Sequence, residues 1–206
     1  MDMLPPLVLR GPTVTLRPLS LDDAGALAAA AAESRDEYGF TRVPDGVEDA
    51  RRYIEAALAE RETRGRLPFA TLWHGRVVGS TSYLAAERWR WPAGSPHQRS
   101  DRPDVVEIGA TWLAASAQRT RCNTEAKRLM LAHAFDVWQV HRVSLKTDAR
   151  NAKSRRAIER LGARFEGVRR ADMPGSDGSV RDSAYYSIVR AEWPDVRTGL
   201  DAALAG

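Results

Sequence analysis

Hydrophobic and polar positions along this 206-residue chain change their period several times. Alternating side chains predict a first strand at residues 14–18. Apolar positions at helical spacing then predict two helices, at about 21–32 and 47–64. Ser20 is a suitable N-cap for the first of these helices, whose first turn is acidic.

The middle of the chain predicts a hairpin followed by an irregular segment. We expect strands at 69–73 and 77–84, joined by a tight turn at 74–76. From 86 to 104 the alternation stops, and Pro and Gly recur beside Trp89 and Trp91. We therefore expect a long inserted loop at about 86–104.

The second half of the chain alternates between the strand period of two residues and the helix period of 3.6. It predicts strands at 105–114 and 142–147, helices at 124–138 and 151–161, and a final pair of strands at 164–168 and 184–189 joined by a turn at 174–178. A polar turn, 116–123, precedes the first of these helices, and Gly162 is a natural C-terminal cap for the second. The order predicts a single mixed α/β domain over 1–206, with about four helices, two of them crossovers, and a partly antiparallel sheet.

Charge and cysteine content restrict the function classes. The net charge is +4, but acidic and basic residues alternate without a long basic run, so we expect no nucleic-acid partner. The lone cysteine, Cys122, excludes a disulfide within the chain. The four histidines show no metal-ligand spacing, and we expect no metal. With neither a signal peptide nor a membrane-spanning run, the sequence favours a cytoplasmic protein.

A family resemblance enters at residues 105–162. The segments EIGATWLA (107–114) and QRTRCNTEA (118–126) resemble the core of the GNAT acetyltransferases, in the branch of the ribosomal-protein N-terminal acetyltransferases. DARNAKSRRAIERLG (148–162) resembles the second cofactor-binding motif of that group, and LRPL (16–19), RDS (181–183) and EWP (192–194) also match. The resemblance covers almost the whole chain apart from 86–104. It implies a twisted, mostly antiparallel mixed sheet and acetyl-CoA as co-substrate.

The resemblance also implies which residues hold the cofactor. A strand-to-helix turn that opens a helix offers backbone N–H groups and a favourable dipole to a pyrophosphate. The implied cofactor-binding residues are Trp112, Leu113, Ala114, Gln118, Arg119, Thr120, Arg121, Cys122, Asn123, Thr124, Asn151 and Ser154.

The turn departs from the family pattern at two glycine positions. Arg121 and Asn123 stand where the family has Gly. Asn tolerates a left-handed backbone, whereas Arg forced to a positive φ would cost on the order of 1–2 kcal/mol. Either the loop binds its ligand somewhat more weakly or it has lost the ligand.

The implied reaction is direct attack of a primary amine on a thioester while both substrates are bound. The amine must lose a proton, which a carboxylate can accept. Our candidate base is Glu107, which counting by two places on the same side of its strand as Gly109 and Thr111. The alternative is an ordinary carboxylate paired with a basic residue.

Other candidate residues carry open alternatives. The family often uses a tyrosine at the position of Ile158 to protonate the thiolate, so that acid is absent here. Ser154 is the candidate that could bond the cofactor sulfur instead, or it is simply a helix-start serine. Asn151 could contact the pantetheine arm, cap its helix, or both. Cys122 has no histidine nearby in sequence, which disfavours a covalent acyl-enzyme.

Two aromatic pairs complete the candidate set. Trp89 and Trp91 either wall the amine pocket, as substrate-binding residues, or pin the inserted loop. One of Tyr185 and Tyr186, on a late strand, should face the core.

Two function classes remain open. The first is an N-acetyltransferase acting on a protein N-terminus or a small-molecule amine. The second is a catalytically weak GNAT-like module that binds acyl-CoA or a protein partner. A homodimer is compatible with either.

Overall fold

The computed structural model describes residues 5–99 and 101–206, and these ranges form one eight-stranded sheet in the order β1-β2-β3-β4-β5-β6-β8-β7. Residues 1–4 and residue 100 of the expected loop lie outside the description. The strands are β1 (Leu9–Arg10), β2 (Val14–Pro18), β3 (Leu67–Trp73), β4 (Arg76–Glu87), β5 (Val105–Leu113), β6 (Arg142–Asp148), β7 (Arg164–Pro174) and β8 (Val180–Val189). Every neighbouring pair is antiparallel except β5 and β6, which run parallel.

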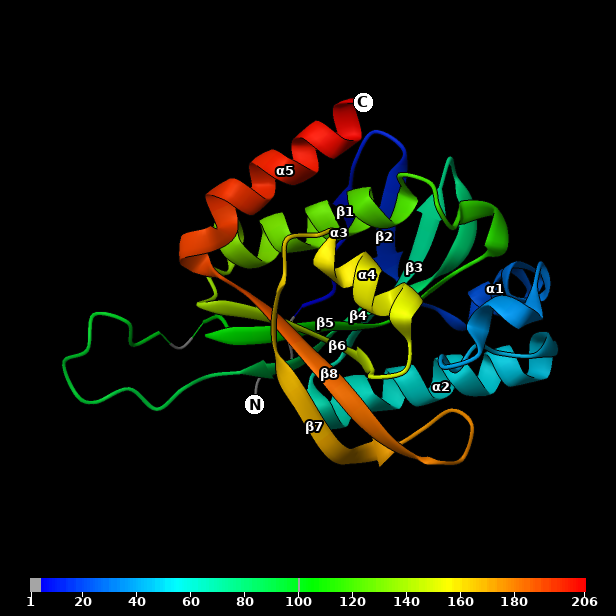
Figure 1. Ribbon diagram of the computed structural model, residues 1–206, viewed down its shortest axis with the longest axis horizontal. Helices are drawn as coiled ribbons and strands as arrows, with labels where there is room; N and C mark the ends of the chain where they lie inside the picture. The colour runs from blue at the N-terminus through cyan, green and yellow to red at the C-terminus, as the bar shows by residue number, and fades with distance from the viewer. Residues whose placement is uncertain (1–4, 100) are drawn as a thin grey trace.

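Helices cover both faces of this sheet (Figure 1). They are α1 (Ala24–Ala32), α2 (Gly46–Arg64), α3 (Cys122–Ala132), α4 (Ala152–Glu159) and α5 (Trp193–Ala205). The helices α3 and α4 lie on one face, where the Tyr83 hydroxyl donates to the Met130 carbonyl of α3. The helices α1 and α2 lie on the other face, and α5 packs beside α3 through the Arg128–Asp201 ion pair. The mixed, mostly antiparallel α/β fold is therefore confirmed.

Several local predictions are confirmed in detail. Ser20 accepts a hydrogen bond from the Asp22 amide in a capping box, although the first turn is a 3-10 helix before α1 begins. His74 (φ 48°) and Gly75 (φ 80°) form a two-residue turn between β3 and β4. Both residues have positive φ, as the tightest hairpin turns require. The helix α3 carries the chain from β5 to the parallel β6, as expected for a crossover.

Other elements differ from the prediction. Five helices are present across the described residues, because α5 was not expected; Pro194 in its first turn is a start signal, but Gly199 interrupts the apolar pattern behind it. The helix α3 begins at Cys122, two residues earlier than predicted, and continues as a π-helix at His133–Val137. The strands β7 and β8 are each longer than predicted, and β1 is a short edge strand that the sequence analysis missed.

The core lies on both sides of the sheet. Tyr83 and Tyr186 are its largest fully buried side chains, so Tyr186 is the late-strand tyrosine that faces the core. Leu131, Phe135 and Trp138 are buried together along α3 and its π-helical extension, as their spacing predicted. No helix in the described ranges is both long and apolar enough to cross a bilayer.

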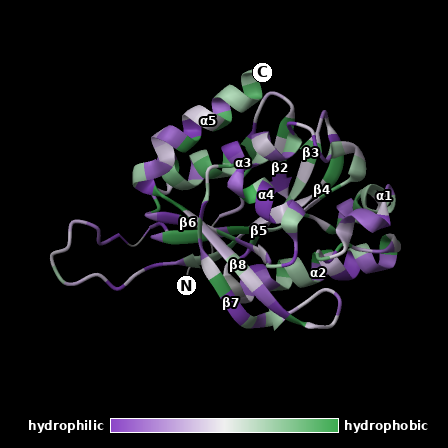
Figure 2. Ribbon diagram, viewed as in Figure 1, coloured by the Kyte–Doolittle hydropathy of each residue, from purple (hydrophilic) through white to green (hydrophobic). Residues whose placement is uncertain are grey.

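The inserted loop begins after Glu87, slightly later than predicted, and returns to the sheet at Val105. It projects from one end of the sheet (Figure 1), and Figure 2 shows it largely in hydrophilic colours. Asp104, 1% exposed, accepts hydrogen bonds from the Trp89 amide at 2.8 Å and from the Trp91 indole at 3.1 Å. The Trp89 ring also stacks on His141, so both tryptophans pin the base of the loop.

Candidate functional site

The parallel strands β5 and β6 separate partway along the sheet. They pair at only three positions, ending with Glu107 opposite Ser144. Beyond that pair, no pairing joins the two strands within the described residues. The edge of β5 that faces β6 therefore carries unpaired strand backbone from Glu107 toward its carboxyl end, and we call this separation of the two strands the opening. Such a backbone edge can hydrogen-bond an extended, amide-bearing ligand as if it were a further strand.

A bulge in β5 decides which side chains face which side. Ala110 has φ 48°, and the register against β4 slips by one residue between the Ser82–Gly109 and Ser80–Trp112 pairs. The prediction that Glu107, Gly109 and Thr111 share one side is therefore wrong for Thr111. Period-two counting fails there because the bulge inserts one extra residue.

The β5–α3 turn has the form that a pyrophosphate site needs. A 3-10 turn at Ala115–Ala117 leads into residues 118–121 and then α3. The Thr120 hydroxyl accepts from the Cys122 amide and donates to the Ala117 carbonyl. Within the described part of the chain, no hydrogen bond engages the N–H groups of five residues here: Arg119, Thr120, Arg121, Asn123 and Thr124. These donors surround the positive end of the α3 dipole, where anions bind favourably.

The strained residue of this turn is Arg119, not Arg121. Arg119 has φ 60°, whereas Arg121 has φ −70° and ψ −12° in the ordinary helical region. The condition for a strain cost at Arg121, a positive φ, is therefore not met, because helix α3 starts early and Arg121 already serves as its N-cap residue. The Arg121 guanidinium turns outward and donates to the Leu204 carbonyl of α5 at 3.0 Å.

Charged side chains from three segments meet beside this turn. The Glu37 carboxylate, between α1 and α2, pairs with Lys153 of α4 and with Arg119 at 3.5 Å. Lys153 also donates to the Gln118 side chain. The hydrogen bond from Lys153 lowers the pKa of Glu37. Two cations are thus held next to the unpaired amides.

Several backbone groups at the end of β5 already form hydrogen bonds within the protein. The Leu113 carbonyl accepts from the Tyr38 hydroxyl at 3.1 Å and from the Gln118 side chain at 2.8 Å. The Ala114 amide donates to Val78, and the Trp112 ring is buried edge-on against Tyr38. Direct contacts of Trp112, Leu113 and Ala114 with a cofactor stay predictions.

Glu107 lies at the closed end of the opening. Its side chain shares a face with Gly109, whose Cβ, if present, would approach the Glu107 carboxylate at 3.1 Å. Glu107 is 9% exposed, and burial raises the pKa of its carboxyl group, although Lys146 opposes this shift. The Lys146 ammonium lies 3.5 Å from Oε2. A desolvated carboxylate with a raised pKa suits a proton acceptor.

A second carboxylate approaches from β7. A bulge between Arg169 and Met173, with Ala171 at φ 50°, turns Asp172 toward Tyr185. The Tyr185 hydroxyl donates to Asp172 at 3.1 Å, and the Lys146 ammonium lies 5.5 Å from the Tyr185 ring centroid. The sequence analysis missed both Lys146 and Asp172 as site residues. Nothing in the sequence marks the bulge that positions Asp172.

The start of α4 provides a capped helix end on the β6 side. The Asn151 side chain accepts from the Ser154 amide at 2.9 Å, so its predicted capping role is confirmed. The Ser154 hydroxyl makes no hydrogen bond within the described residues. Ile158, at the position of the family tyrosine, is buried in the core. The roles of Asn151 and Ser154 toward a cofactor stay predictions.

Cys122 is fully buried in the first turn of α3. Burial raises the pKa of its thiol to about 12. A thiol that keeps its proton is a poor nucleophile, so the geometry disfavours covalent catalysis through Cys122.

Comparison with known proteins decides the family. The model of the family described as "Acetyltransferase (GNAT) domain" matches residues 13–164, which is most of the chain. The chain belongs to the GNAT acetyltransferase family. The parted parallel strands and the β5–α3 turn are therefore features of a GNAT domain.

Individual relatives agree with this assignment. The Bacillus subtilis (strain 168) protein named "Putative ribosomal N-acetyltransferase YdaF" is 34% identical over 88 residues, which is 43% of this chain and 47% of that protein. The match thus spans about half the length of that curated relative. A crystal structure described as that of a "putative acetyltransferase" from T. thermophilus is 34% identical, covers 99% of this chain and 100% of its own, and has a TM-score of 0.80. Mycobacterium smegmatis RimJ in complex with CoA-disulfide shares the fold, with 24% identity, a TM-score of 0.72 and coverage of 96% and 93%.

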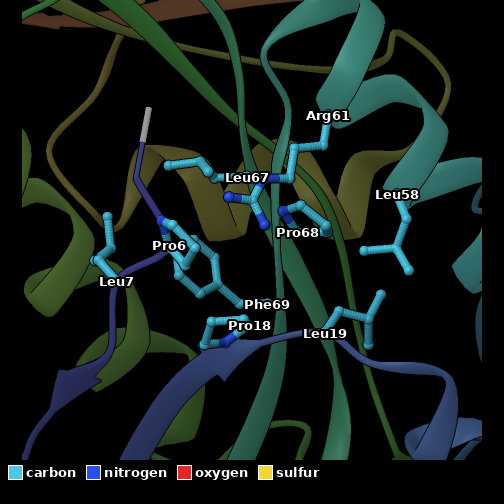
Figure 3. A pocket seen from close by; sticks show the side chains of 9 residues that line it. All are labelled: Pro6, Leu7, Pro18, Leu19, Leu58, Arg61, Leu67, Pro68 and Phe69. Carbon is cyan, nitrogen blue, oxygen red and sulfur yellow. The ribbon is translucent and has the colours of Figure 1, made fainter. Parts of the chain in front are cut away.

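Two features lie away from the opening of this GNAT domain. Trp89 and Trp91 sit at the amino-terminal end of β5, the opposite end from the β5–α3 turn, and their part in an amine pocket stays a prediction. A small hollow lies between the N-terminal segment, β2, β3 and α2, and Figure 3 shows apolar side chains around most of it. It is lined by Pro6, Leu7, Pro18, Leu19, Leu58, Arg61, Leu67, Pro68 and Phe69. No carboxylate is among them, so we place no proton transfer there.

Proposed function

We propose that this GNAT-family protein transfers an acetyl group from acetyl-CoA to a primary amine by direct attack in a ternary complex. In this proposal the pyrophosphate is bound by the free amides of the β5–α3 turn, with the cations of Arg119 and Lys153 beside it. The pantetheine arm extends along the unpaired edge of β5. The thioester then lies near Glu107, where β5 and β6 meet.

One observation carries the proposal. The opening between β5 and β6 leads from the N-terminus of α3, which suits a phosphate, to a buried carboxylate, which suits a proton acceptor. An anion site and a base at the two ends of one extended opening match a long ligand whose reactive group is remote from its phosphates.

We assign Glu107 as the base that accepts the amine proton. The raised pKa of its carboxyl group moves it toward that of the amine, which makes the transfer easier. We assign Ser154 as a hydrogen-bond donor to the sulfur, because Ile158 offers no proton.

The finer assignments rest on the relatives and on the chain's surface. The name of YdaF, a putative ribosomal N-acetyltransferase, favours a protein amine, such as an N-terminus, as the acceptor over a small-molecule amine. We also propose that the protein is cytoplasmic. We further propose one acyltransferase domain over 1–206 with the inserted loop as an addition. The edge strand β7, where Phe165 is 50% and Val168 46% exposed, is our candidate surface for a homodimer.

The test is a transfer assay with the purified chain, acetyl-CoA and a panel of amines that includes N-terminal peptides and small amines. Amine-dependent release of CoA together with an acetylated product supports the proposal. Tight binding of acetyl-CoA without transfer to any amine would favour the alternative, a catalytically weak module that binds acyl-CoA or a protein partner. Ile158 stands where the family often has a proton-donating tyrosine, and this replacement is the reason to retain the alternative.

A further inference from the structure

Lys146 is an unusual choice for a basic residue in this chain. Only three of its 31 Lys and Arg residues are lysines. An arginine beside a carboxylate can bind it with two parallel hydrogen bonds but cannot lose its proton, whereas a lysine can. A lysine at a carboxylate pair in an arginine-rich protein points to a use for a neutral amine.

The position of Lys146 makes that use specific. It lies on β6, two residues beyond Ser144, where β6 has just separated from β5. Its Nζ is 3.5 Å from the Glu107 carboxylate, and its side chain is 26% exposed. An amine and a proton acceptor thus stand together at the closed end of the opening.

We infer that Lys146 is itself acetylated in cis by bound acetyl-CoA, an inference that rests on the proposed function. The Lys146 ammonium first passes one proton to the Glu107 carboxylate. The neutral amine attacks the thioester carbonyl, so that a C–N bond forms and the C–S bond breaks. The second nitrogen proton goes to the departing thiolate, and Glu107 releases its proton to water. The sum is one amide, one CoA thiol and one proton.

The modification changes the site. Acetylation removes the cation that faces Glu107 and the Tyr185 ring. It also fills the position where an incoming amine would meet the base. We therefore expect the acetylated chain to transfer acetyl groups to external amines more slowly.

The other two lysines provide internal controls. Lys127 is 4% exposed and bonds Thr81 and Thr111 between α3 and the sheet. The Lys153 side chain is 49% exposed and pairs with Glu37. Non-specific acetylation by the thioester favours the most accessible amine, so it would modify Lys153 before Lys146.

The experiment incubates the full chain with acetyl-CoA alone and maps acetyl groups on the three lysines by peptide mass spectrometry over time. We expect Lys146 to be modified first, at a rate per molecule that does not depend on protein concentration. We expect Glu107→Gln to slow modification of Lys146 on the order of a hundredfold and to leave that of Lys153 unchanged.

The outcomes separate this inference from the proposed function. Acetyl transfer to external amines with Lys146 unmodified overturns the inference and leaves the proposed function standing. Modification of Lys153 before Lys146, or equal rates in the Glu107→Gln variant, also overturns it. No stabilisation by acetyl-CoA together with no modification overturns both.

Discussion

Glu107 and Thr111 lie on opposite faces of β5, although they are four positions apart and an unbroken alternation would place them on the same face. The bulge at Ala110 is the cause, because it inserts one residue into the alternation. The Glu107 carboxylate meets Lys146 on the face that carries α2, whereas the Thr111 hydroxyl accepts from Lys127 on the α3 face. One irregular residue in β5 thus directs Glu107 toward Lys146 on one face and Thr111 toward Lys127 of α3 on the other.

Replacing Glu107 by Gln tests its role as the base. The amide keeps the shape but cannot accept the amine proton, so we expect kcat to fall by roughly 10² to 10⁴. The dissociation constant of acetyl-CoA should stay within about threefold, because the phosphates bind at the other end of the opening. Steady-state kinetics and calorimetric titration give the two quantities. An unchanged kcat would remove Glu107 from the mechanism.

The pH profile of kcat/KM tests the Glu107–Lys146 pair. Glu107 must be ionised to act, and burial raises its pKa, so activity should be lost as the pH falls through a value above that of an ordinary glutamate. Lys146 lowers this pKa. Lys146→Met should therefore move the acidic limb to higher pH, whereas Lys146→Arg, which keeps the charge, should not. A limb that stays in place in Lys146→Met would contradict the pairing.

The sequence predicted the fold better than the site. Period and cap signals place β2 to β6 and α2 well, because each rests on local chemistry such as the Ser20 cap and the positive φ of Gly75. The bulges at Ala110 and Ala171 depend on pairing with distant strands, so counting by two misplaced Thr111 and gave no reason to choose Asp172. The resemblance located the β5–α3 turn and drew attention to Arg121, whereas the residue with a left-handed backbone is Arg119.

Two glycine substitutions test where that strain lies. Arg119 has a left-handed backbone, which costs a non-glycine residue about 1–2 kcal/mol, so Arg119→Gly should leave the free energy of unfolding unchanged or raise it by about 1 kcal/mol. Arg121 has an ordinary backbone that needs no glycine, so Arg121→Gly relieves no strain; a more flexible unfolded chain and the lost bond to Leu204 should lower the free energy of unfolding by about 0.4–1 kcal/mol. Urea unfolding of both variants gives the comparison. A larger loss in Arg119→Gly would contradict the assigned backbone.

Lys127 should make stability depend on pH. Burial lowers its pKa in the folded protein to about 7, below its value in the unfolded chain. Between about pH 7 and pH 10 the unfolded chain binds a proton that the folded lysine lacks, so stability rises with pH. Relative to Lys127→Met, the wild-type free energy of unfolding should increase over this range by roughly 2–4 kcal/mol.

Urea unfolding at several pH values measures this difference. Lys153→Met, which removes an exposed lysine, is the matched control. Parallel pH profiles of the wild-type protein and Lys127→Met would show that Lys127 stays charged in the fold.

The central claim is that the opening between β5 and β6 binds acetyl-CoA. The most direct measurement is thermal unfolding with and without acetyl-CoA, with adenosine 3′,5′-bisphosphate as the control ligand. At about 100 times its dissociation constant, acetyl-CoA should add roughly 2.7 kcal/mol of stability. This raises Tm by about 5–10 °C in a domain of this size. We predict a clear rise with acetyl-CoA and a smaller one with the bisphosphate. No rise at saturating acetyl-CoA would contradict the account.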